Sequence, residues 1–93
     1  MTTDYEWCVE EMDGEDIVDN HFCDDYAECV EHSEAGDAIA LVCSIGNESE
    51  GLQDRDWAYV VDGKLPGEFP AMGRKVPKRF HAEVAKLKRE LAR

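Results

Sequence analysis

The chain has 93 residues and a formal net charge of −12, from 22 Asp and Glu against ten Lys and Arg. This length fits one domain, residues 1–93, with a modest core, because a chain of this size buries only about 60–65% of its unfolded surface. An apolar fraction of 43% favours a globular domain over a disordered one. The first residues lack signal-peptide character and no run approaches the roughly 18 apolar residues of a membrane span, so we expect a cytoplasmic protein with reduced cysteines.

The first strands are predicted as a hairpin. Residues 5–11 alternate apolar and acidic side chains, residues 17–22 resume a strand pattern, and residues 13–16 have turn composition. With Gly14 and Glu15 at the centre of the turn, residues whose numbers sum to 29 should face each other. The facing pairs would then be Trp7 with Phe22, on the core side, and Cys8 with His21, on the outer side.

The remaining elements complete an α+β fold. We expect a short helix over residues 25–34, ended by Gly36, then a strand over 38–45, a polar loop over 46–56, a strand over 57–61 and an irregular connector over 63–75. An amphipathic helix should follow from Pro77, with Val84 and Leu91 on its docked face. The predicted order is β-β-α-β-β-α, an antiparallel sheet with helices packed on one face. The acidic ββα half covers about 4–36, and the ββ unit with the basic helix about 37–93.

The two later strands are apolar on both faces, which suggests that the second face of the sheet is also covered. The cover would be either the 63–75 connector or another copy of the chain in a homodimer.

One cluster could bind a metal. Cys8, His21 and Cys23 would project together from the outer face of the hairpin, and thiolate with imidazole is a zinc ligand set. A fourth ligand from Cys29 or His32 would lie on a helix that is expected on the other face. A zinc-stabilised structural module is therefore an alternative hypothesis, next to that of apolar cysteines and a surface histidine.

No catalytic or cofactor motif is recognisable. The cysteines lie in strand-like or helical apolar positions without an evident base, and the glycines of residues 63–73 lack the strand-to-helix context of a phosphate loop. We therefore expect a non-enzymatic protein without a cofactor.

Charge is the feature with the clearest physical consequence. Residues 1–63 hold nineteen Asp and Glu against Arg55 alone, a net charge of −18, whereas residues 64–93 hold nine bases and three acids, a net charge of +6. An acidic field repels nucleic acid and attracts proteins with cationic grooves, many of which bind nucleic acid. The residues predicted to contact such a partner are Glu10, Glu11, Asp13, Glu15, Asp16, Asp19, Asp24, Asp25, Glu28, Glu31, Glu48, Glu50 and Asp54. An acidic surface that serves only solubility is the simpler alternative.

The basic end supports a different hypothesis, a nucleic-acid-binding module that uses the C-terminal helix. Against it, Arg79 with Glu83 and Lys86 with Glu90 have the four-residue spacing of helical ion pairs, and late bases complement the helix dipole. The acidic body would also repel DNA.

The segments GLQDRDWAYVVDGKLPGEF and VPKRFHAEV resemble small uncharacterised proteins of bacteriophages and prophages, over roughly the second half of the chain. The resemblance implies a protein of the host-cell cytoplasm that binds a host factor of the restriction, CRISPR or transcription machinery, in some cases by imitating DNA. It assigns no functional residue.

Overall fold

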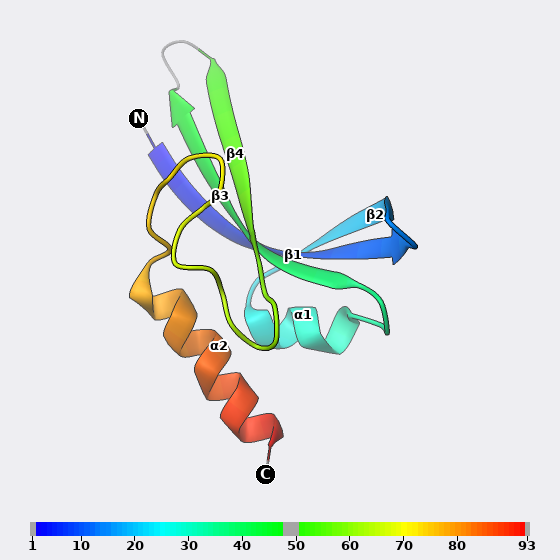
Figure 1. The fold of residues 1–93 in the computed structure, drawn as a ribbon. Coiled ribbons are helices and arrows are strands. Elements are labelled where there is room, and N and C mark those ends of the chain that lie inside the picture. The colour runs from blue at the N-terminus through cyan, green and yellow to red at the C-terminus, as the bar shows by residue number, and fades with distance from the viewer. Residues whose placement is uncertain (1, 48–50, 93) are drawn as a thin grey trace.

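The fold is α+β, with the predicted element order. The computed structural model describes residues 2–47 and 51–92, so Glu48 and Glu50 of the predicted contact residues lie outside the described part. Its elements are β1 (Thr2–Asp13), β2 (Asp16–Cys23), α1 (Tyr26–His32), β3 (Ala38–Asn47), β4 (Leu52–Tyr59) and α2 (Lys78–Leu91) (Figure 1). Among the described residues, no helix is long and apolar enough to cross a membrane.

The four strands form one antiparallel sheet in the order β2-β1-β3-β4. Both helices lie on the same side of it, as predicted (Figure 1). The sheet edges are therefore the acidic strand β2 and strand β4.

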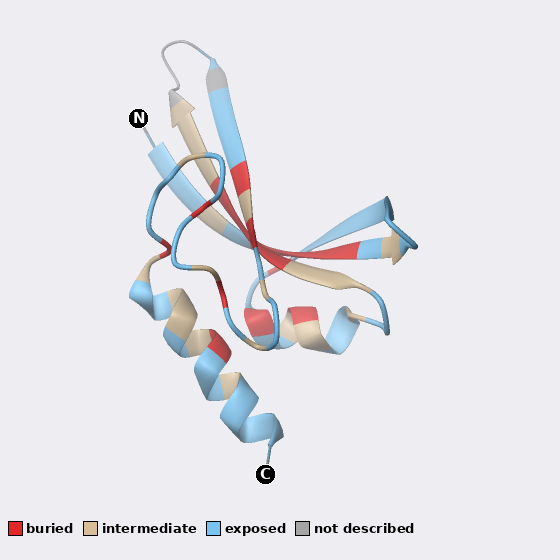
Figure 2. Ribbon diagram, in the orientation of Figure 1, coloured by how far each residue is buried: buried red, intermediate tan, exposed pale blue. Residues whose placement is uncertain are grey.

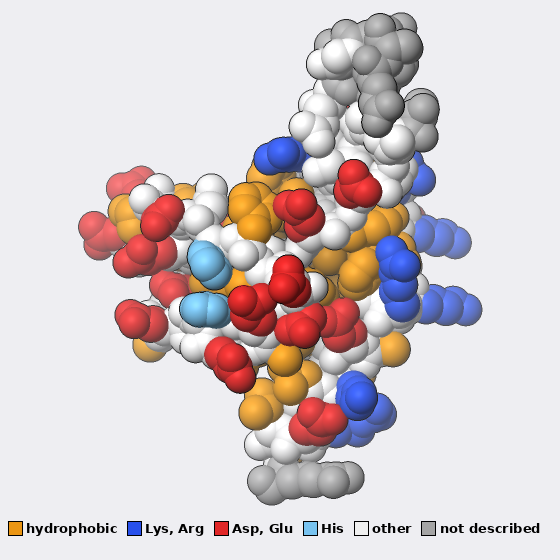
Figure 3. All heavy atoms as spheres, turned by 180° about the vertical axis from the view of Figure 1, so that it is seen from behind, with side chains coloured by type: hydrophobic (Ala, Val, Ile, Leu, Met, Phe, Trp, Pro, Cys, Tyr) orange, Lys and Arg blue, Asp and Glu red, His pale blue; other side chains and the backbone are white. Residues whose placement is uncertain are grey.

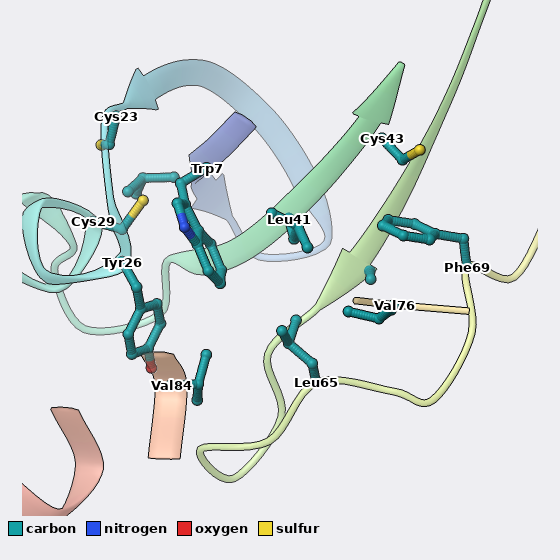
Figure 4. Close-up of a cluster of buried hydrophobic side chains, with 12 residues drawn as sticks. Trp7, Cys23, Tyr26, Cys29, Leu41, Cys43, Leu65, Phe69, Val76 and Val84 are labelled. Carbon is teal, nitrogen blue, oxygen red and sulfur yellow. The ribbon is translucent and has the colours of Figure 1, made fainter. Parts of the chain in front are cut away.

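The core lies between the sheet and the helices, and the buried residues concentrate in the middle of β1, β3 and β4 (Figure 2). Alternate strand positions supply it, because successive side chains of a strand point to opposite faces. The buried cluster comprises Trp7, Val9, Cys23, Tyr26, Cys29, Leu41, Cys43, Ala58, Leu65, Phe69, Val76 and Val84 (Figure 4). The Trp7 and Tyr26 rings, 5.1 Å apart between centroids, join β1 to α1.

The predicted register of the hairpin is wrong over most of its length. Near the turn Met12 faces Ile17, so the residue numbers of the facing pair add up to 29 as predicted. Beyond a β-bulge Val9 faces His21 and Cys8 faces Phe22, and the residue numbers of each pair add up to 30. Val18 is the extra residue that β2 inserts at the bulge. Because one residue of shift turns every later side chain to the opposite face, Phe22 leaves the core side and is 44% exposed, while His21 turns towards the helices.

Strand β4 begins earlier than predicted, so most of the expected loop over 46–56 is sheet. β3 runs on to Asn47 and β4 starts at Leu52, with Ile45 facing Asp54 and Cys43 facing Asp56. The polar first half of β4 lacks an apolar alternation because its side chains are mostly exposed at the edge of the sheet.

Both helices are close to expectation, with differences at their ends. α1 ends at His32, and Gly36, at a φ of 95°, belongs to the turn that follows and does not cap the helix. In α2 Val84 is buried and Phe80 and Leu87 are partly buried, but Leu91 is 65% exposed. The helix therefore docks on the core through its first three turns only.

The connector, residues 60–77, is irregular as predicted, but it does not cover the second face of the sheet. Its buried residues Leu65, Phe69 and Val76 join the core on the helix side. On the second face the small buried residues each face a larger partner across the ladder: Cys8 faces Phe22, Ala40 faces Tyr59, and Val42 faces Trp57. These partners bury the small residues beneath them, whereas Phe22 and Tyr59 are themselves partly exposed on this face.

Candidate functional site

The predicted contact residues gather mainly on the hairpin and α1. Acidic side chains cover that side of the molecule, whereas the Lys and Arg side chains lie mostly on the side of α2 (Figure 3). Those exposed are Glu11, Asp13, Glu15, Asp16, Asp19, Asp24, Asp25 and Glu31, which we call the acidic surface, and Asp54 of β4, which is separate from it. Within the described residues, none of the carboxylates of the acidic surface forms an ion pair with a Lys or Arg.

Two pairs of these carboxylates face each other directly across the hairpin. Glu11 is opposite Asp19, and Asp13 is opposite Asp16 at the turn. Like charges directly opposite each other on a strand pair are destabilising. The hairpin therefore carries an unfavourable charge arrangement that its own fold does not compensate.

Glu10 is not part of the acidic surface. It lies on the second face of the sheet, is 4% exposed, and accepts a hydrogen bond from the Tyr59 hydroxyl at 2.8 Å. Its carboxylate is thus a structural group that joins β1 to the edge strand β4.

Two other predicted contact residues organise the start of α1. Asp25 is the N-cap and accepts a hydrogen bond from the Glu28 backbone N–H at 2.8 Å. The Glu28 side chain reaches back, and its Oε2 accepts from the Asp24 N–H at 2.7 Å. This is close to the capping box predicted for Asp25 and Glu28. Exchanging either residue would disturb α1 as well as the surface charge.

The helix-facing side of the hairpin borders a cavity of about 230 Å³. Its wall is strongly acidic and contains two histidines: it is formed by Val9, Glu11, Asp19, Asn20, His21, His32, Glu34 and Asp37.

The metal cluster predicted from Cys8, His21 and Cys23 does not form. Cys8 and His21 project from opposite faces because of the bulge, and Cys8 is fully buried. His21 instead meets two residues of α1, and ligand atoms of His21, Glu28 and His32 all lie within 4.8 Å of one another. The sequence does indicate that Glu28 and His32 are neighbours, since they are four residues apart and share one face of a helix.

The cysteines are poor nucleophiles. Burial raises the pKa of the Cys8 thiol to about 11, and it also raises the pKa values of Cys23, Cys29 and Cys43 above the usual value. Because the thiolate is the reactive form, these side chains are protonated and unreactive near neutral pH.

No family model, curated protein or solved structure matches the chain.

Within α2, which the structure describes in full, the predicted ion pairs are not formed. Glu83 accepts a hydrogen bond from the Tyr26 N–H at 2.9 Å, at the start of α1, instead of pairing with Arg79. The Arg79 guanidinium lies over the Phe80 ring, 4.6 Å from its centroid. Lys86 and Glu90, both described, form no ion pair either. Lys88 donates to the Asp62 carbonyl, so part of the basic charge holds α2 in place.

The Glu10–Tyr59 hydrogen bond predicts a pH-dependent stability. Burial and this hydrogen bond raise the pKa of Tyr59 from 10 to about 12. Below pH 10 the hydroxyl is protonated in both folded and unfolded chains, so its stabilisation is complete; it is lost as the pH rises through 12.

We expect Tyr59→Phe to lower the free energy of unfolding by about 1–2 kcal/mol at neutral pH, because buried Glu10 loses its donor. Urea unfolding should show the gap between wild type and variant closing between pH 10 and 12, while a constant gap would contradict this prediction. Cys8 titrates in the same range in both proteins, and its charge adds to the rise in the pKa of Tyr59.

Proposed function

We propose that this protein is a non-enzymatic binding module whose acidic surface engages a cationic groove on another protein. The observation that carries the proposal is the pair of like-charged ladder positions on the hairpin, Glu11 with Asp19 and Asp13 with Asp16. An acidic coat that serves only solubility has no need to set carboxylates directly against each other, where they reduce stability. A cationic partner placed over the hairpin would remove that repulsion.

The partner class follows from charge. Grooves that bind nucleic-acid backbones are lined with Lys and Arg, and a row of exposed carboxylates can occupy them in place of phosphates. The concrete form of the proposal is an inhibitor of a nucleic-acid-handling host protein, of the restriction, CRISPR or transcription machinery, as the resemblance to phage proteins implies. The first hairpin and α1 would form the contact.

Affinity purification from a bacterial lysate tests the proposal. At low ionic strength the wild-type protein should retain a nucleic-acid-binding protein, identified by mass spectrometry, and the yield should fall steeply as salt screens the carboxylates. A variant with Asp13, Glu15 and Asp16 all changed to Lys should no longer retain that nucleic-acid-binding protein. The control changes Asp54 and Glu68, two exposed acids outside the acidic surface, to Lys, and should retain the protein. Retention of no such protein, or equal retention by the hairpin variant, would overturn the proposal.

Direct nucleic-acid binding through α2 is the competing outcome. In a gel-shift assay with duplex DNA we expect no shift, because the acidic surface repels phosphate. A shift that Lys78→Glu abolishes would assign the function to α2 and reject the acidic surface as the contact.

A further inference from the structure

Two imidazoles and a carboxylate meet where β2 passes α1. The ligand atoms of His21, Glu28 and His32 lie within 4.8 Å of one another, and the two imidazole ring centroids are 4.7 Å apart. Glu28 Oε1 is 3.8 Å from His32 Nε2. His21 and His32 are exposed, so an ion from solvent could reach them directly.

The backbone holds the three residues in this arrangement. His21 faces α1 because of the bulge at Val18, and only two residues, Asp24 and Asp25, separate β2 from α1. Glu28 is fixed from two sides, because its N–H donates to Asp25 and its Oε2 accepts from Asp24. These hydrogen bonds use one carboxylate oxygen and leave Oε1 directed at His32. Such outer hydrogen bonds commonly fix the orientation of a metal ligand.

We propose that His21, Glu28 and His32 bind one divalent transition-metal ion, with zinc as the probe that fits best. Two imidazole nitrogens and one carboxylate oxygen are an established zinc ligand set, and a solvent molecule takes the fourth position. Ligands at about 2.0–2.2 Å from a tetrahedral zinc ion lie roughly 3.4 Å apart. Pairs of atoms now within 4.8 Å reach that spacing by small rotations of two exposed imidazoles.

The adjoining cavity adds a favourable field. Four carboxylates line the same wall as the two imidazoles: Glu11, Asp19, Glu34 and Asp37. They raise the local concentration of cations and can accept hydrogen bonds from the second nitrogen of each imidazole or from water on the ion. The ligand set still favours a transition metal over magnesium or calcium, because these prefer oxygen ligands alone.

This site goes beyond the proposed partner contact and does not depend on it. The ion would attach β2 to α1 on the helix side of the hairpin. The turn carboxylates Asp13 and Asp16 lie outside the ligand set, so failure of metal binding and failure of partner binding are distinguishable with the variants named for each.

Calorimetric titration of the chelator-treated protein with zinc chloride tests the site. We expect binding of one equivalent, with the affinity reduced at least about tenfold in His21→Gln and in His32→Gln. The matched control is His81→Gln, which removes the third histidine of the chain, on α2, and should bind like wild type. Far-UV circular dichroism should show that all three variants are folded, since His21 and His32 lie at the surface.

Cobalt(II) identifies the ligands. A site of nitrogen and oxygen ligands gives a visible cobalt spectrum without the intense near-ultraviolet thiolate charge-transfer band, and a tenfold excess of magnesium should leave it unchanged. Four results would overturn the proposal: no binding, binding that His21→Gln leaves intact, a thiolate band, or displacement by magnesium. The last would show that the carboxylates bind cations without the imidazoles.

Discussion

Replacing Asp13 with Lys is expected to make the protein more stable and, at the same time, a weaker ligand for the proposed cationic partner. Asp13 faces Asp16 across the turn of the hairpin, so the substitution converts a like-charge pair into an opposite-charge pair. Opposite charges at facing strand positions contribute roughly 0.2–1 kcal/mol, and like charges cost a similar amount. We therefore expect a gain of about 0.5–1 kcal/mol in the free energy of unfolding, measured in urea at low salt.

The double variant separates local pairing from net charge. With Lys at both positions 13 and 16, the facing pair is like-charged again, so the gain in stability from pairing should largely disappear. The affinity for the partner should instead fall at each step, from wild type to the single variant to the double variant. Each exchange removes a negative charge and adds a positive one. We expect a loss of affinity of the order of tenfold for each exchange at low ionic strength, and less as salt rises.

The matched control is Glu68→Lys, the same change of charge at an exposed position of the connector. It should leave the affinity for the partner within about twofold of wild type, because the connector is not part of the proposed contact and charges farther away than a Debye length of about 10 Å are largely screened. Equal losses from Asp13→Lys and Glu68→Lys would mean that only net charge matters and that the hairpin is not the contact.

This combination of effects is what distinguishes function from solubility at the acidic surface. If the carboxylates only kept the chain in solution, relieving the Asp13–Asp16 repulsion would improve stability without any loss of binding. A gain in stability with a loss of binding is the behaviour expected where a site is maintained at the expense of the fold.

The sequence predicted the fold well where burial dictates the pattern. The alternation of Trp7 and Val9 and the apolar run from Ala38 to Ile45 identified β1 and β3, since these strands contribute most of the core. The spacing of Phe80, Val84 and Leu87 identified α2 for the same reason. The start of β4 was missed, because residues such as Asp54 and Arg55 face solvent and their composition resembles a loop.

The candidate metal site was missed because of one residue. Without a bulge, His21 would face outwards beside Cys8, and the predicted cluster would have contained thiols. Val18 is an ordinary strand residue, and nothing in its identity marks it as an insertion into the ladder. Because of this single unpaired residue, His21 lies beside Glu28 and His32 and not beside Cys8. Sequence alone could place Glu28 and His32 on one helix face but could not bring His21 to them.

Glu10 illustrates a related difficulty. Its neighbour Glu11 is exposed on the hairpin, and both are acidic residues in an acidic strand, so the sequence offers no reason to separate them. The difference arises from the partner strand β3 and from β4 beyond it, which brings the Tyr59 hydroxyl to within 2.8 Å of the carboxylate. Only tertiary contacts identify Glu10 as a structural residue.

The largest effect on stability is expected from Asp56→Ala. Asp56 is 7% exposed, and its carboxylate accepts three backbone N–H groups, from Trp57 at 2.8 Å, from Ala71 at 2.6 Å and from Met72 at 3.0 Å. The last two belong to the connector, so this side chain attaches the connector to β4. Alanine would leave these donors without an acceptor, and each buried donor that loses its partner costs about 1–3 kcal/mol. We expect a loss of about 3 kcal/mol in the free energy of unfolding, measured in urea, because part of the connector can relax towards water.

Asp54→Ala is the matched control, since Asp54 lies two residues earlier on the same face of β4 but is exposed. It should change stability by less than about 0.5 kcal/mol. The loss of stability in Asp56→Asn should lie between those of the two alanine variants. The amide keeps one acceptor oxygen but places its own NH₂ group against a remaining backbone N–H. β4 and the hairpin strand β2 form opposite edges of the sheet, so folded Asp56→Ala should still bind the proposed cationic partner. Equal stability of the two alanine variants would show that the connector is held by the packing of Leu65, Phe69 and Val76 alone.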